Sequence, residues 1–511
     1  MERPIVELNM YGRDYEQELR PLIRAFVTDA EFDVTHEDAD EASMRLIFQK
    51  EDAPLLLSAN GAYTYSFCLL MMEDWYRLRM YRYGELIGEA QVERVDPERK
   101  AYRNRIAREI YRVLAKAEGK TLPWGILTGV RPTKQVYDAI AAGVSEEEIR
   151  GHMKEEYLCS DEKLDVSLTV SRREYELLTR MDYQNGYSVY IGIPFCPTTC
   201  HYCSFTSYPL AKFGGMADAY LDALERELRF AGGCFPGRKL STVYIGGGTP
   251  TALNEAQLER LLGMVHRYLP MADCREFTVE AGRPDSITEE KLRLLKAQGA
   301  SRISINPQTM QQRTLELIGR RHTVEQIREA FWLARALGHD NINMDIIIGL
   351  TGEAPEDVEG TLREIAKLSP DSLTVHTLAR KRAARLSTER ERYEGLEAVG
   401  VTEMLEKTVR FAKEQSYLPY YLYRQKNMAE NLENVGYARY GKEGLYNILI
   451  MEEKQTILAL GAGATSKFVF PAEGRLERVE NVKSLKDYIE RIDEMIARKK
   501  NFLEGAENLW I

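Results

Sequence analysis

Three of the seven cysteines lie in one short segment, and they are the residues best suited to chemistry. Cys196, Cys200 and Cys203 follow the spacing C-x3-C-x2-C. Three thiolates on one loop can bind three irons of a 4Fe–4S cluster and leave the fourth iron open to an external molecule. The alternative is a zinc site, which four protein ligands normally close. His201 or a remote cysteine would be the fourth ligand, but His201 lies in the same loop, badly placed to close a tetrahedron, so we favour the cluster.

The segments around these cysteines predict a barrel. From about residue 187, short β-branched runs alternate with amphipathic helical patterns. Such β/α units in series require a parallel sheet, so we expect an α/β fold with a partial or complete parallel β/α barrel and its chemistry at the C-terminal strand ends. Strands are predicted over 188–193, 241–245, 276–280, 302–306, 341–348 and 372–376, and helices over 217–231, 256–268, 288–298, 324–337 and 355–368.

We expect three domains: an N-terminal accessory α/β domain over 1–180, the barrel over 181–385 and a mainly helical C-terminal domain over 386–511. Segment 94–120 is rich in Arg and Lys, and we interpret it as a solvated amphipathic helix rather than an anion or nucleic-acid site. Ser145 and Glu148 predict a capping box. The Gly-rich loop 460–466 either passes close to a ligand or forms a tight turn.

Composition excludes several classes of protein. Hydrophobic residues make up 44% of the chain, charged residues 29%, and the formal net charge is -10. No apolar run reaches the roughly 18 residues of a membrane span. Neutralising DNA phosphates needs a surplus of Lys and Arg, which this acidic chain lacks. Because the N-terminus also lacks a signal-peptide pattern, we expect a cytoplasmic protein that binds neither membrane nor DNA.

Further glycines and polar residues fall at the ends of predicted strands. The motif Gly246-Gly247-Gly248-Thr249 ends the second strand, and residues without Cβ let backbone groups approach a zwitterion closely. Glu280 ends the third strand, and Asp345 lies in the fifth. Each alone could be a turn or a buried polar residue, but their shared position at strand ends favours a binding site.

This combination resembles the radical S-adenosylmethionine (SAM) enzymes. The order of the motifs resembles the oxygen-independent coproporphyrinogen III oxidase (HemN-like) branch, over about residues 186–380. The long N-terminal extension, its loop 129–132 and segment 424–427 resemble the HemZ-type coproporphyrinogen dehydrogenases of that branch. The resemblance makes 181–385 the radical SAM core and 386–511 a HemN-like C-terminal domain.

The resemblance implies a 4Fe–4S cluster on Cys196, Cys200 and Cys203 and one or two molecules of SAM. By position, it implies contacts with the first SAM at Tyr190, Gly247 and Glu280. It implies contacts with a second SAM at Tyr202, Gly248, Thr249, Gln308, Arg320, Asp345 and Ala379.

Two positions depart from the pattern of members with proven oxidase activity. Gly192 stands where a His is common, and Phe205 stands where a Cys is typical. A Phe at the latter position is usual in the haem-chaperone branch of the family. Neither change touches a cluster ligand, but without that His another group, such as Tyr190, His201 or a bound water, must handle protons. We expect His201, a lone His in a loop, to be solvated.

The function implied is that of a radical SAM oxidoreductase. It would decarboxylate coproporphyrinogen III propionates oxidatively to the vinyl groups of protoporphyrinogen IX, with a flavodoxin- or ferredoxin-type electron donor. Burying substrate carboxylates requires cations. The candidates are Arg320, Arg380, Lys381, Arg382 and Arg385, of which the last four could equally form a solvated loop.

Three alternatives stay open. The first is a haem-binding chaperone of the same fold, and the second is a radical SAM enzyme that degrades or methylates haem. The third is radical-based RNA modification by way of the basic N-terminal segment. It is the weakest, because the chain is acidic and lacks an aromatic RNA-binding signature.

Overall fold

The computed structural model describes residues 3–38, 63–92, 96, 98–379, 393, 395–396, 398–425, 432–506 and 509. The chain divides into two compact units, Met1–Leu168 and Thr169–Ile511. Each unit has its own sheet. No described helix combines the length and the apolar character that a membrane span requires.

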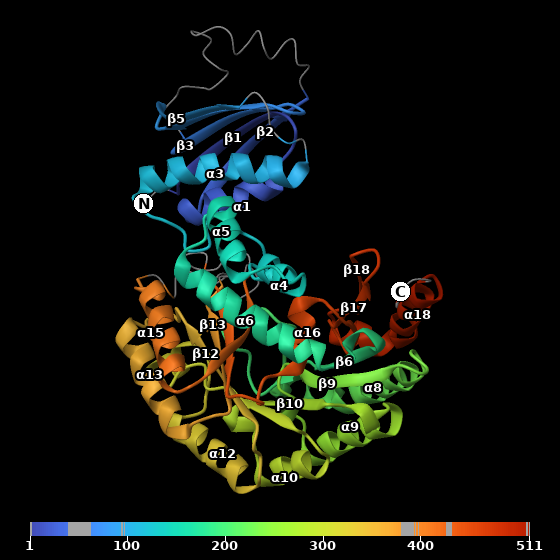
Figure 1. The fold of residues 1–511 in the computed structure, drawn as a ribbon. Helices are drawn as coiled ribbons and strands as arrows, with labels where there is room; N and C mark the ends of the chain where they lie inside the picture. Colours follow the sequence, from blue (N-terminus) through green and yellow to red (C-terminus); the bar gives the residue numbers. More distant parts are fainter. Residues whose placement is uncertain are drawn as a thin grey trace. The chain divides into compact units, whose positions relative to one another are not determined.

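The first unit is a five-stranded sheet of order β2-β1-β3-β4-β5, with α1 and α3 on one face (Figure 1). The segment read as an amphipathic helix forms α3, which buries Ile106 and Ile110, and Ser145 and Glu148 form the predicted capping box of α5. Its elements are β1 (Ile5–Gly12), α1 (Glu16–Phe26), β2 (Glu31–Glu37), β3 (Tyr65–Met71), β4 (Tyr76–Arg82), β5 (Glu85–Val92), α3 (Arg99–Glu118), α4 (Lys134–Ala141) and α5 (Glu146–Tyr157), and α6 (Asp161–Thr179) runs into the second unit.

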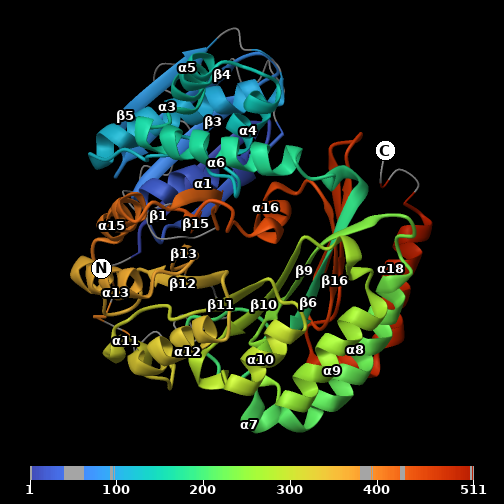
Figure 2. The same cartoon turned by 60° about the horizontal axis from the view of Figure 1, so that its bottom comes forward.

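The second unit is built on an 11-stranded sheet that curls into an open barrel with helices on its outer face (Figure 2). The six predicted strands are confirmed and run parallel, adjacent in the order β6-β9-β10-β11-β12-β13. They are β6 (Gly186–Ile193), β9 (Lys239–Gly247), β10 (Glu276–Gly282), β11 (Arg302–Ile305), β12 (Ile342–Ile348) and β13 (Ser372–Thr377). The predicted helices are α8 (Ala217–Gly232), α9 (Glu255–Tyr268), α10 (Glu289–Ala297), α12 (Val324–Ala336) and α13 (Pro355–Leu368), and α11 (Gln312–Leu317) lies between β11 and α12.

The C-terminal region is less helical than expected, because it extends the barrel sheet at both edges. β16 pairs parallel with β6, and β15 pairs antiparallel with β13. Within the region expected to be mainly helical, the tyrosine-rich segment Leu418–Tyr423 forms a strand, β14, in line with the preference of aromatic residues for strands. The boundary expected at residue 385 lies outside the described residues and stays a prediction. The elements are α15 (Val401–Glu414), β14 (Leu418–Tyr423), β15 (Asn434–Ala438), α16 (Leu445–Glu452), β16 (Thr456–Leu460), β17 (Thr465–Phe470), β18 (Arg475–Glu480), α17 (Leu485–Glu490) and α18 (Ile492–Glu504).

A buried ion pair ties α18 to α8. Lys499 Nζ lies 2.7 Å from Glu227 Oε1, and both side chains are fully buried. Glu227 also accepts hydrogen bonds from the Tyr488 hydroxyl (2.6 Å), the Gly461 N–H (2.8 Å) and the Asn481 amide (2.8 Å). The network therefore fixes the loop after β16, whose Gly461 carbonyl accepts a further bond from Asn481 (2.8 Å).

We expect Lys499→Met to lower the free energy of unfolding by about 3–5 kcal/mol, because it leaves the Glu227 carboxylate buried without its cation. Lys500→Met is the matched control. The neighbouring Lys500 is exposed, and its Nζ lies 3.8 Å from Glu504 Oε1. We therefore expect its replacement to change the free energy of unfolding by no more than about 0.5 kcal/mol. Urea midpoints at unchanged m-value measure both effects. A loss no larger than that of the control would contradict the role given to this pair.

Candidate active site

The inner face of the barrel is polar. Successive residues of a strand point to opposite faces, and polar side chains on alternate positions bond across neighbouring strands. The Thr242 hydroxyl donates to Ser188 Oγ (2.8 Å), and the Tyr244 hydroxyl donates to Glu280 Oε1 (2.5 Å). Intervening residues such as Val243 are apolar and fully buried. The interior thus offers hydrogen-bonding groups rather than a packed apolar core.

The three cysteines lie in the loop that follows β6. The two-residue strands β7 (Phe195–Cys196) and β8 (Tyr208–Pro209) pair and close this loop at its base. All three cysteines are free thiols. The Thr249 hydroxyl lies 3.6 Å from Cys196 Sγ, and Arg283 Nη1 lies 3.8 Å from Cys200 Sγ. Donors of this kind stabilise ligating thiolates.

The donor set fits a 4Fe–4S cluster. Burial raises the pKa of Cys196 to about 12, so the free side chain is a neutral thiol, whereas a coordinating thiol is deprotonated outright. The guanidinium of Arg283 is held by two hydrogen bonds to Asp285 (2.9 and 2.6 Å) and provides a fixed positive charge beside the sulfurs. In the described part of the chain no three His, Cys, Asp or Glu side chains converge on a point for a single metal ion. In a 4Fe–4S cluster each thiolate binds a different iron.

His201 is buried, which corrects the expectation that it is solvated. Its Nδ1 lies 3.1 Å from the Leu317 carbonyl oxygen and 2.6 Å from the Tyr393 hydroxyl. Its Nε2 lies against Gly319, where a Cβ would come within 2.7 Å. Both ring nitrogens thus face protein groups, and this arrangement disfavours the zinc site that His201 would have completed.

The glycine motif at the end of β9 is clamped against the cysteine loop. The N–H of Gly248 donates to the Ile193 carbonyl (2.8 Å), and the N–H of Thr249 donates to the Phe195 carbonyl (2.7 Å). A Cβ on Gly248 would lie 2.6–2.7 Å from these same two carbonyl oxygens. Gly247 has a φ of 103°, which side chains rarely tolerate. The local backbone structure therefore requires glycine at these two positions, independently of any role in binding.

Glu280 lies behind this motif. Its Oε1 accepts the bond from Tyr244, whose ring stacks on those of Tyr190 and Tyr446 with centroids 6.1 and 4.5 Å away. A Cβ on Gly246 would come within 2.7 Å of the Glu280 carboxyl carbon. Burial raises the pKa of Glu280 to about 7, so the protonated and ionised forms are both populated near neutral pH.

This raised pKa predicts that SAM affinity rises with pH. Below pH 7 the free protein holds Glu280 protonated, and binding a cationic ligand beside it must first remove that proton. We expect SAM to bind about tenfold more weakly at pH 6 than at pH 8, measured by equilibrium dialysis of the anaerobic holoprotein. Glu280→Gln should lack this component, because an amide does not titrate. Equal pH dependence in the two proteins would contradict a role for Glu280 beside SAM.

A second polar group lies on β11, β12 and the loop after β11. Arg320 donates to the Asn306 carbonyl (2.5 Å) and the Tyr202 hydroxyl (3.2 Å). Gln308, at a φ of 67°, donates its N–H to the Asp345 carbonyl (2.9 Å). Although burial opposes ionisation, hydrogen bonding from His376 and from Asn343 holds the pKa of Asp345 below its usual value. Ala379 is half-buried just beyond the end of β13.

Several buried polar atoms in this region have no hydrogen-bond partner among the described residues. Buried polar groups are normally paired, so these atoms indicate that the interior accommodates a polar ligand. They are Ser304 Oγ, Asn306 Oδ1, Gln308 Oε1 and Arg320 Nε.

Comparisons with known proteins agree with this geometry. Residues 190–365 match the Radical SAM superfamily. Over 409 residues the chain is 42% identical to the oxygen-independent coproporphyrinogen-III oxidase-like protein HemZ of Bacillus subtilis (strain 168), which covers 79% of this chain and 82% of that relative. The chain belongs to the HemN-like branch of the radical SAM superfamily. Superfamily membership implies a 4Fe–4S cluster and SAM.

The chain is also similar to relatives that carry two different functional names. The chain is 40% identical to the heme chaperone HemW of Bacillus subtilis (strain 168) over 192 residues, which is 37% of this chain and 50% of that relative. The solved structure of HemN from Escherichia coli, described as a coproporphyrinogen III oxidase and radical SAM enzyme, matches with a TM-score of 0.50 at 26% identity. That match covers 63% of this chain and 73% of the other. The chain is thus similar both to proteins named as oxidases and to a protein named as a chaperone.

The structure brings the expected residues together in two groups. Tyr190, Gly247 and Glu280 lie around the glycine motif, while Tyr202 and Arg320 lie beside the cysteine loop. Of the cation candidates, Arg320 is buried and already bonded, and Arg380, Lys381, Arg382 and Arg385 lie outside the described residues.

Sequence reasoning missed Arg283 and His376. Arg283 follows β10 directly, so the rule that found Glu280 would have found it as well. His376 lies one strand away from Asp345, with its Nε2 3.8 Å from Asp345 Oδ2. Only the strand register, which pairs Asp345 with Thr374, places these two side chains near each other.

Proposed function

We propose that this radical SAM protein is an oxidative decarboxylase that converts the propionate side chains of coproporphyrinogen III to vinyl groups in anaerobic haem biosynthesis. The observation that carries the proposal is the three-cysteine loop, which is clamped against a glycine motif and lies beside a half-buried carboxylate in a polar barrel. The name of the 42% identical relative, oxygen-independent coproporphyrinogen-III oxidase-like, favours this substrate.

The cofactor contacts belong to the same proposal. Cys196, Cys200 and Cys203 hold the cluster. Tyr190, Gly247 and Glu280 hold the first SAM, with the backbone near Gly247 and the Glu280 carboxylate binding its cationic groups. If a second SAM binds, its contacts are Tyr202, Gly248, Thr249, Gln308, Arg320, Asp345 and Ala379.

When bound, the cluster and SAM supply one-electron reduction and hydrogen-atom abstraction. The substrate loses a hydrogen atom from the propionate β-carbon, the bond to the carboxylate breaks, and carbon dioxide leaves as the vinyl double bond forms. One electron remains and passes to an acceptor, and a flavodoxin- or ferredoxin-type protein supplies the reducing electron. The chain's own residues orient the reactants, with the glycine motif held against the cysteine loop and the tyrosine stack packed behind it.

The second candidate is a haem-binding chaperone. It is favoured by the 40% identity to the chaperone HemW and by Phe205, a residue that is 68% exposed beside the cysteine loop. If the protein is a chaperone, it should bind haem stoichiometrically and form no product.

Anaerobic turnover of coproporphyrinogen III with reductant and SAM, analysed by product mass, separates the two. The decarboxylase releases one carbon dioxide and one 5′-deoxyadenosine for each vinyl group formed. Tight haem binding with no product favours the chaperone. A ring-opened or methylated product from haem would favour haem degradation or methylation instead.

A further inference from the structure

A cavity of about 210 Å³ opens beside the cysteine loop in the second unit. Part of its wall is formed by Tyr190 and Gly247, the proposed contacts of the first SAM. Another part comes from the C-terminal region, namely residues 462–464 of the loop after β16 and Lys483. The cavity therefore adjoins the proposed SAM site and extends beyond it to side chains that have no role so far.

Away from the proposed SAM contacts, the wall of the cavity carries an aromatic ring, that of Phe205, and a cation, that of Lys483. Phe205, from the end of the cysteine loop, is 68% exposed. Ser204 and Thr206 on either side of it also line the cavity and carry hydroxyls. Lys483 is exposed and brings an ammonium group. A flat apolar ligand that ends in a carboxylate would match these groups.

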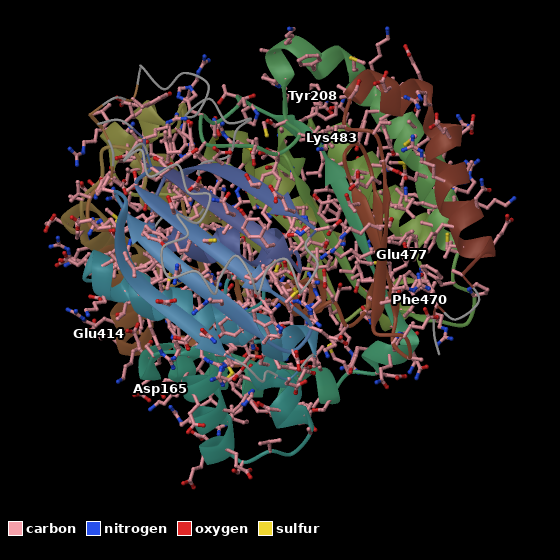
Figure 3. All side chains as sticks on the ribbon, turned by 90° about the horizontal axis from the view of Figure 1, so that it is seen from above. Asp165, Tyr208, Glu414, Phe470, Glu477 and Lys483 are labelled. Atoms are coloured by element: carbon pink, nitrogen blue, oxygen red, sulfur yellow. The ribbon has the colours of Figure 1, made fainter. Side chains whose placement is uncertain are left out.

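Lys483 is held beside the cysteine loop through its backbone. The Tyr208 hydroxyl, on the strand that closes that loop, donates to the Lys483 carbonyl (3.1 Å) and accepts the N–H of Leu485 (3.0 Å). Figure 3 shows Tyr208 and Lys483 side by side. The N–H of Gly463 donates to the Val482 carbonyl (2.8 Å), which joins this segment to the loop after β16. The backbone of Lys483 is therefore held at a defined position beside the cavity.

Lys483 also has no acidic partner among the described residues. Arg283 is bound by Asp285, and Arg320 is bonded to Asn306 and Tyr202. In the described part of the chain, no carboxylate lies within ion-pair distance of Lys483, whereas Lys486 nearby lies 3.8 Å from Glu490. A carboxylate entering the cavity would meet a cation with no competing protein anion.

We propose that this cavity receives one propionate-bearing edge of the tetrapyrrole, with Lys483 binding the carboxylate and Phe205 lying against the pyrrole ring. The inference rests on the proposed function and names the part of the chain that binds that substrate. The cavity is smaller than the roughly 300–1,000 Å³ of sites that enclose a whole drug-sized ligand, so it suits one edge of the macrocycle.

Binding of coproporphyrin III to the anaerobic holoprotein with SAM, followed by quenching of porphyrin fluorescence, tests this proposal. We expect Lys483→Glu to weaken binding about tenfold, because attraction is replaced by repulsion, and Lys483→Arg to retain it. Lys486→Glu is the matched control and should bind as the unmodified protein does. The number of SAM molecules per cluster should be the same in all four proteins.

Aetioporphyrin III, which has the same ring without carboxylates, tests the role of charge. Its binding should be unaffected by Lys483→Glu. Equal weakening of both porphyrins, or no weakening of either, would overturn the assignment of Lys483 while leaving the proposed function intact. If the unmodified protein binds no coproporphyrin III and forms no vinyl product, both proposals fail.

Discussion

Replacing any one of Cys196, Cys200 and Cys203 with Ala is expected to abolish the visible absorption of the cluster and to reduce SAM cleavage to background. A cluster with three protein ligands has no spare thiolate in its loop, so the loss of one ligand leaves two irons open. Iron content and absorption after anaerobic reconstitution measure the effect, and 5′-deoxyadenosine yield measures its consequence.

Cys274→Ala is the matched control for the cluster cysteines. Cys274 is half-buried and donates its thiol to the Glu276 carbonyl (3.2 Å), on a strand of the same barrel. This variant should retain iron and absorption. If Cys274 or another scattered cysteine proves indispensable for iron content, the three-cysteine site with an open iron is wrong.

Gly247→Val is expected to lower 5′-deoxyadenosine formation about a hundredfold while iron content stays normal. Gly247 has a φ of 103°, and a Cβ there would lie 2.9 Å from the Tyr190 hydroxyl. A β-branched side chain would shift the backbone of the motif and fill space at the proposed SAM site. The yield of 5′-deoxyadenosine per cluster is the measurement.

Gly263→Val is the control for added bulk, because Gly263 lies in α9 with open space around its Cβ position. It should cleave SAM at the normal rate. Unchanged cleavage in Gly247→Val would remove the glycine motif from the SAM site.

The barrel could be predicted from the sequence because its signals are local. The helix period and the β-branched runs predicted all six parallel barrel strands, and the rule that chemistry lies at the C-terminal strand ends selected Glu280 and Asp345. The capping box at Ser145 was likewise confirmed, since all of its partners lie within one turn of helix.

The features that were missed depend on partners distant in the sequence. His201 is buried because Leu317 and Tyr393 bond its ring, and a lone His in a loop carries no sign of such partners. β16 joins the barrel sheet by pairing with β6, which is distant from it in the sequence.

The two departures from the family pattern meet in one place. Gly192 and Phe205 both line the cavity beside Lys483. At Gly192 a Cβ would have no neighbour closer than 3.4 Å, so the missing side chain leaves space there. The sequence identified both positions but not the cavity that they share with Lys483, because the contact between Tyr208 and Lys483 joins segments distant in the sequence.

Anaerobic turnover of coproporphyrinogen III carrying deuterium on the propionate β-carbons tests the central claim most directly. If the protein abstracts a hydrogen atom from that carbon, mass spectrometry will find one deuterium in each 5′-deoxyadenosine, in step with each vinyl group formed. Unlabelled 5′-deoxyadenosine, or none in a protein that retains its cluster and binds haem, would contradict the proposed decarboxylation.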